Sequence, residues 1–254
     1  ISAVRSAVFR NAERMGIDPS KIAGFCTCFD KGLIDVILNK KPNVVGSIVA
    51  NNVPRGVASN DVAIKSNYFS HPGAGNTSAA DPFTLFFAGK FSSTNGEEIR
   101  TLSGYSFGSS YSQYLSARKS FIDDTDDSLN NISVSRTTSG ILSLGASSFG
   151  GAITENAEVI AVGSIVGNAA YLWASVNGYY NNITGTPGSS TSSRSNLNIL
   201  GGPKLYRTDA GGSSVFIALA LKSGILSESA DMLIRSPYAL LQPAPQPYIF
   251  DMAA

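Results

Sequence analysis

Apolar residues near the start of the chain recur every three or four positions. The stripe consists of Ile1, Val4, Val8, Ala12 and Met15, and arginines lie outside it. This spacing predicts an amphipathic helix over residues 1–16, with Gly16 as its stop and Asp18-Pro19 as a turn. We expect this helix to be a docking arm or a cap rather than a domain of its own.

From Ile22 onward the apolar period changes to two, which is typical of β-strands. Turn-forming residues separate the apolar segments at intervals of roughly 8 to 12 residues, the spacing found in sandwiches and barrels. Asn177-Gly178, between Leu172–Val176 and Tyr179-Tyr180, is the strongest hairpin signal. The predicted strands cover 25–29, 33–38, 44–50, 62–68, 83–91, 101–107, 111–117, 131–136, 141–144, 158–166, 170–176, 197–200, 204–207 and a long run from Ser214.

The last of these strands is apolar at neighbouring positions from Val215 to Leu221. Such a strand must be covered on both faces. A short helix is predicted after it, with Ser227 as N-cap, Glu228 in the first turn and Pro237 beyond its end. Because so short a helix is not stable alone, we expect it to close the edge or end of the folded domain.

Composition and charge fit one large all-β domain. Charged residues make up 15% of the chain and the formal net charge is +1, so no basic surface indicates nucleic acid as a partner. No apolar run approaches the roughly 18 to 20 residues of a membrane span, and no signal peptide is visible at the start. The predicted organisation is a helical arm over 1–21, a sandwich over 22–241 and a Pro-rich extended tail over 242–254.

The two cysteines, Cys26 and Cys28, lie on one predicted strand. Two residues apart, their Cα atoms would be roughly 6.5 to 7 Å from each other, at or beyond the limit for a disulfide. No further ligands of the same softness lie near them in the sequence, so we interpret them as small buried apolar residues and predict no metal or other cofactor. The lack of a disulfide framework favours assembly in a reducing cytosol over secretion.

Three segments, in the same order, resemble one family. They are Pro82-Phe-Thr-Leu85, Glu158–Val162 leading to Tyr171-Leu-Trp-Ala-Ser-Val-Asn-Gly178, and the closing Phe216–Leu241. Together they resemble the laminin-G-like, concanavalin A-like jelly rolls of phage and prophage virion proteins, over residues 22–241. The resemblance implies an all-β, two-sheet antiparallel jelly-roll sandwich of about a dozen strands. It also implies a virion surface component, glycan binder or scaffold more often than an enzyme.

Catalytic patterns of enzymes with this fold are missing from the sequence. Retaining glucanases need paired carboxylates facing one cleft about 5 to 5.5 Å apart, as in Glu-x-Asp-x-x-Glu, and no such motif is present. His71 is the only histidine and is predicted to lie in a loop, His71-Pro-Gly, without partners for a lyase site or a Ser-His-Asp triad. We therefore predict that the protein is not an enzyme.

Two groups of residues are candidates for ligand binding. The acidic cluster Asp123, Asp124, Asp126 and Asp127 could hold Ca²⁺, but it lacks the glycine and the terminal glutamate of an EF-hand, and a solvated turn is favoured. The second group could stack on sugars, although strand alternation must turn half of it into the core. It consists of Tyr105, Tyr111, Tyr114, Tyr179 and Tyr180.

The sequence thus favours a non-enzymatic structural protein of a bacteriophage virion, capsid-decorating or tail-associated, assembled in the host cytoplasm. Its expected partners are other virion proteins and copies of itself, contacted through the terminal segments. The alternative is a carbohydrate-binding, lectin-like or host-receptor-binding module that recognises host surface glycans.

Overall fold

The computed structural model describes residues 1–29, 32–45, 48–49, 53–54, 68–72, 81–91, 98–107, 110–119, 131–136, 141–151, 157–188, 196–200 and 214–243. Within these ranges the strands form two seven-stranded antiparallel sheets and a two-stranded ribbon of β4 (Ile48–Val49) and β5 (Val53–Pro54). The prediction of an all-β, two-sheet jelly-roll sandwich with one helix near each end is confirmed.

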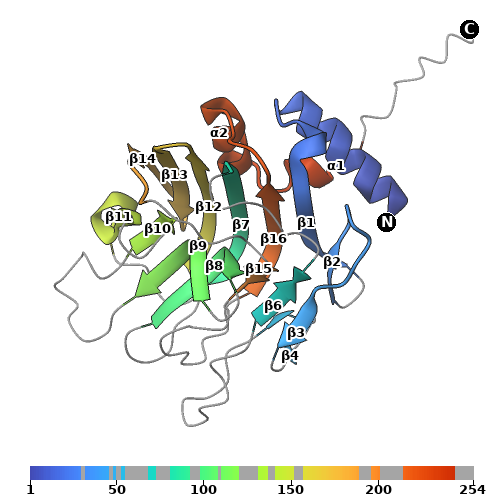
Figure 1. The fold of residues 1–254 in the computed structure, drawn as a ribbon, viewed down its shortest axis with the longest axis horizontal. Helices are drawn as coiled ribbons and strands as arrows, with labels where there is room; N and C mark the ends of the chain where they lie inside the picture. The colour runs from blue at the N-terminus through green and yellow to red at the C-terminus, as the bar shows by residue number, and fades with distance from the viewer. Residues whose placement is uncertain are drawn as a thin grey trace, which may run out of the picture.

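Sheet A runs across the view in Figure 1 from β14 to β2. Its strands, in spatial order, are β14 (Tyr179–Gly185), β13 (Ala169–Val176), β12 (Ala157–Val166), β7 (Phe83–Phe91), β16 (Ser214–Leu221), β1 (Ile22–Phe29) and β2 (Gly32–Asp35). Those of sheet B are β11 (Ile141–Gly145), β10 (Asn131–Ser135), β9 (Ser110–Lys119), β8 (Glu98–Phe107), β15 (Asn196–Ile199), β6 (Tyr68–His71) and β3 (Asn43–Val45).

Most predicted strands are found within a few residues of their predicted bounds. The main difference is the segment 33–38, where β2 ends at Asp35 because the carboxylate of Asp35 accepts hydrogen bonds from the backbone amides of Ile37 and Leu38. Asn39, with a φ of 51°, completes the turn. The predicted strand at 204–207 and most of the one at 62–68 lie outside the described residues.

The central strands of sheet A separate two apolar cores. In β16, Val215, Ala218 and Ala220 face the core between the sheets, whereas Ile217, Leu219 and Leu221 belong to a second core on the outer face. A register shift between Val215 and Ile217 accommodates this change of face. The prediction that this strand is covered on both sides is confirmed.

Two helices and a 3₁₀ turn cover the outer face of sheet A (Figure 1). In α1 (Ser2–Arg14) the predicted stripe is buried at Val8 and Ala12, and Gly16, with a φ of +72°, lies just beyond the helix end. Ile1, by contrast, is exposed. The helix therefore packs on the sandwich of its own chain, which makes this apolar stripe a cap.

A buried amide joins the two ends of the chain. Asn11 of α1 donates from Nδ2 to the carbonyl oxygens of Leu240 (3.1 Å) and Gln242 (2.8 Å), at the 3₁₀ turn η6 (Ala239–Leu241). These bonds hold the C-terminal segment against α1. Of the predicted tail over 242–254, the structure describes residues 242 and 243.

The second helix, α2 (Ser227–Arg235), buries Ala230, Leu233 and Ile234 against the outer core, as its apolar side predicts. Its predicted N-cap is wrong. Ser227 is the first helical residue, the N-cap is Leu226, and no side chain caps the helix. None of the helices in the described ranges is long and apolar enough to cross a membrane.

Candidate functional site

A cleft of about 350 Å³ lies between the C-terminal end of α2 and the β12–β14 end of sheet A. It combines an aromatic ring, charged groups and a hydroxyl on a partly apolar floor. Its lining consists of Glu158, Ile160, Ser175, Gly178, Tyr180, Ile234 and Arg235.

Strand register explains why these side chains meet. Tyr180 of β14 pairs with Ser175 of β13, and Ser175 pairs with Ile160 of β12, so the three side chains form a row on the outer face. The hairpin that sets this register turns at Asn177 and Gly178, with φ values of 49° and 85°. Two consecutive positive φ angles are those of a type I′ turn, which confirms the predicted hairpin.

The ring of Tyr180 is surrounded by polar and charged groups. The Arg235 guanidinium lies over it, 6.0 Å from the ring centroid, at the outer limit of a cation–π contact. Arg235 also pairs with Asp231 one helical turn earlier, at 2.7 Å between Nε and Oδ2. Partial burial raises the pKa of Tyr180, although its hydrogen bond from the amide of Asn182 acts in the opposite direction. The ring nevertheless remains 38% exposed.

Tyr105 and Tyr179, two of the other tyrosines proposed for sugar stacking, do not join Tyr180. Tyr179 is 58% exposed, but it pairs with Val176, whose side chain points to the opposite face, and it packs beside Gly150. Tyr105 is buried in the inner core, edge to face with Phe83 at 6.0 Å between ring centroids. A joint platform of Tyr179 and Tyr180 is therefore excluded by strand alternation. The side chains of Tyr111 and Tyr114 lie outside the described residues.

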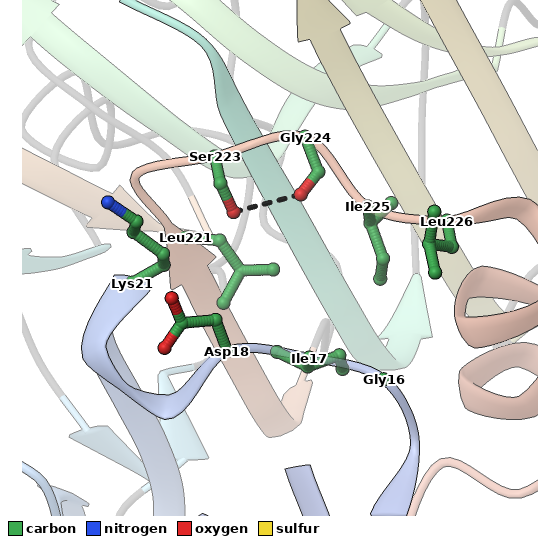
Figure 2. A pocket seen from close by; sticks show the side chains of 9 residues that line it. All are labelled: Gly16, Ile17, Asp18, Lys21, Leu221, Ser223, Gly224, Ile225 and Leu226. Carbon is green, nitrogen blue, oxygen red and sulfur yellow. Dashed lines mark hydrogen bonds between the residues drawn. The ribbon is translucent and has the colours of Figure 1, made fainter. Parts of the chain in front are cut away.

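A second hollow, of about 380 Å³, lies where the loop after α1 approaches the connection from β16 to α2 (Figure 2). The nine side chains drawn there include Asp18, Lys21 and Ser223, whose hydroxyl donates to the carbonyl of Gly224. The Asp18 carboxylate is already engaged with Ser20, whose side chain and backbone amide both hydrogen-bond to it and lower its pKa. Because none of the residues that line this hollow carries an aromatic ring, we favour the first cleft as the candidate binding site.

His71 is not a loop residue, as the sequence predicted, but the last residue of β6. Its side chain is 1% exposed, and its Nε2–H donates to Oδ2 of Asp35 at 2.7 Å. Cys26 lies beside this pair, and one donor atom from each of the three residues lies within 4.8 Å of the other two. The sequence was searched only for ligands of the same softness close to the cysteines, whereas strand pairing and sheet packing bring Asp35 and His71 to Cys26 from other segments.

The two cysteines differ in environment. Both are free, but only Cys26 is buried, so the prediction of two buried apolar residues is wrong for Cys28. The thiol of Cys28 donates to the carbonyl of Val215 at 3.2 Å. Burial, with the negative charge of Asp35 as a second cause, raises the pKa of Cys26 well above its ordinary value.

Some candidates remain untested, and others were missed. Asp123, Asp124, Asp126 and Asp127 lie outside the described residues. Arg235 and Glu158 were not considered as binding residues because they come from distant segments. The sequence did contain a signal for Asp35 as a site residue. An aspartate inside the apolar run 33–38 must either be buried with hydrogen-bonding partners or end the strand.

Neither a scan against protein-family models nor a search of curated proteins found a match. Solved structures do match. Trypanosoma rangeli sialidase in complex with sialic acid superposes with a TM-score of 0.56 at 13% identity, covering 92% of this chain and 38% of that chain. The same enzyme with 2,3-difluoro-KDN gives 0.55 at 14% identity, covering 87% and 33%. A mutant displaying trans-sialidase activity gives 0.55 at 11% identity, covering 93% and 39%.

These similarities establish the fold alone, and the chain spans well under half the length of the sialidases. The resemblance to jelly rolls therefore holds at the level of the β-sandwich. The prediction that the protein is not an enzyme is contradicted, because the solved structures reported above, which share its fold, are of a sialidase. The motif argument tested only for a carboxylate pair and for histidine-containing sites, so it addressed only these types of catalytic site.

Proposed function

We propose that the chain is a carbohydrate-binding module and that the cleft between α2 and the β12–β14 end of sheet A holds the sugar. The observation that carries the proposal is the exposed ring of Tyr180 sharing one cleft with the Arg235 guanidinium, the Glu158 carboxylate and the Ser175 hydroxyl.

This combination suits the chemistry of a sugar. A pyranose has an apolar face of C–H groups that packs on an aromatic ring, and a rim of hydroxyls that donate and accept hydrogen bonds. Arg235 supplies donors, Glu158 supplies acceptors and Ser175 supplies both. The volume of about 350 Å³ lies within the range of roughly 300 to 1,000 Å³ of small-molecule sites. The fold, shared with a sialidase solved with sialic acid, supports the proposal at the level of architecture.

The proposal is tested by screening the full chain on a glycan array and measuring the best ligand by calorimetry. Tyr180→Ala is expected to weaken binding roughly tenfold to a hundredfold. Burying an aromatic ring contributes about 1.5–3 kcal/mol, and each ~1.4 kcal/mol is a factor of ten in affinity.

Tyr179→Ala is the matched control, because Tyr179 is the adjacent tyrosine, is more exposed and points to the other face. It should leave affinity unchanged. Binding that is lost in Tyr179→Ala but retained in Tyr180→Ala would place the site elsewhere. A chain that binds no glycan on the array would contradict the proposal as a whole.

The role in a phage virion, with virion proteins and further copies of the chain as partners, stays a prediction. It rests on the sequence resemblance, and the structures reported above are of sialidases. The apolar stripe of α1 is engaged with its own sandwich, so attachment through the N-terminal segment would have to use the exposed side of this helix.

A further inference from the structure

Three metal-ligating side chains meet inside the sandwich, away from the cleft. Cys26 and Asp35 are cross-strand partners in β1 and β2 of sheet A, and cross-strand partners project their side chains to the same face. His71 comes from the end of β6 in sheet B. The donor atoms, one from each residue, all lie within 4.8 Å of one another.

The cluster is closed to solvent. Cys26 and Asp35 are 0% exposed and His71 is 1% exposed. One oxygen of Asp35, Oδ1, accepts the backbone amides of Ile37 and Leu38, which fixes the carboxylate and leaves Oδ2 facing His71. A buried carboxylate is stable only when its charge is compensated. Here Oδ2 lies 2.7 Å from Nε2 of His71, and a bound cation would compensate the charge.

We propose that Cys26, Asp35 and His71 bind one Zn²⁺ ion that ties β1 and β2 of sheet A to β6 of sheet B. A thiolate, a carboxylate and a neutral imidazole carry two negative charges, which the ion neutralises. The donor set of sulfur, nitrogen and oxygen is typical of zinc, whereas calcium and magnesium take oxygen ligands. The three residues supply three of the four ligands of a tetrahedral ion.

Binding exchanges protons for the ion. Zn²⁺ enters as the Cys26 thiol gives up its proton and His71 binds through an unprotonated Nε2, so binding is coupled to proton release. Ligand atoms about 2.0–2.1 Å from a tetrahedral ion are about 3.3 Å apart. His71 Nε2 and Asp35 Oδ2, now at 2.7 Å, would therefore move apart by a fraction of an ångström, on the order of a side-chain rotation.

The test uses the full chain, freed of metal with a chelator and then titrated with Zn²⁺ or with Co²⁺ as a spectroscopic probe. We expect one Zn²⁺ per chain after dialysis, a rise in Tm on adding Zn²⁺ that chelator reverses, and a thiolate-to-cobalt charge-transfer band in the near ultraviolet. Cys26→Ser should lose the band and the stoichiometric zinc. Cys28→Ser is the matched control, because Cys28 is exposed and two residues away on the same strand, and it should retain both.

Circular dichroism would reveal a variant that fails to fold. The measurements on the unaltered chain decide the proposal even in that case. A chain that retains no zinc, shows no cobalt band and has the same Tm with and without Zn²⁺ would overturn it. So would loss of the cobalt band in Cys28→Ser with retention in Cys26→Ser, because the ion would then lie at the surface.

Discussion

Replacing Asp35 with alanine should strongly destabilise the interface between the two sheets. The carboxylate accepts the amides of Ile37 at 2.8 Å and Leu38 at 3.0 Å, and it lies 2.7 Å from the imidazole of His71. Asp35→Ala removes the acceptor of a buried imidazole and of three backbone amides, because Phe25 also donates to Oδ1, at 3.4 Å. Breaking a buried pair by removing one partner costs about 3–5 kcal/mol, a large part of the roughly 5–15 kcal/mol that stabilises a domain.

The measurement is urea unfolding with chelator present, so that metal binding does not contribute. The single tryptophan, Trp173, is buried in the outer core and reports unfolding by fluorescence. Combining Asp35→Ala with His71→Ala closes a double-mutant cycle, and we expect a coupling of about 0.5–3 kcal/mol between neighbours in one network. A loss below about 1 kcal/mol in Asp35→Ala, within the usual effect of a single substitution, would refute the claim that this pair holds the sheets together.

Three further predictions concern packing, the joined termini and the thiols. Gly163→Ala should lower the free energy of unfolding in urea by about 1–3 kcal/mol, because the added Cβ would lie 2.6 Å from Cγ2 of Val134. Adding Val134→Ala should recover part of this loss. Asn11→Ala should cost about 2 kcal/mol by leaving two carbonyls near η6 without their donor; an unchanged Tm would contradict this. A thiol reagent should label Cys28 in the folded protein and Cys26 only after unfolding. The pKa of Cys26 is raised above 9.0 in the folded state, so the Cys26 thiol ionises at lower pH in the unfolded chain than in the folded one. The free energy of unfolding should therefore fall as pH rises past 9.0. Cys26→Ser should show a smaller decline.

Local patterns were sufficient for the elements of the fold. The period-two alternation placed β7, β12 and β13, the doubly apolar run in β16 required cover on both faces, and Asn177-Gly178 located the β13–β14 hairpin. These features are legible in sequence because they depend on side-chain direction and backbone preference within a few residues. The same alternation predicted that half of the tyrosines point into the core but did not say which, and of those described Tyr105 is buried there.

The sites depended on contacts between distant segments. His71 was interpreted as a loop residue because its neighbours are Pro72 and Gly73, yet it ends a strand and meets Asp35 across the interface between the sheets. Arg235 reaches the cleft because α2 packs on β12 and β13, more than fifty residues away in sequence. Strand order and sheet stacking are set by the summed burial of two cores, a property of the whole chain that no local period encodes. Alternation therefore determined which side chains could share a face, and only the packing of the sheets and helices decided which of them meet.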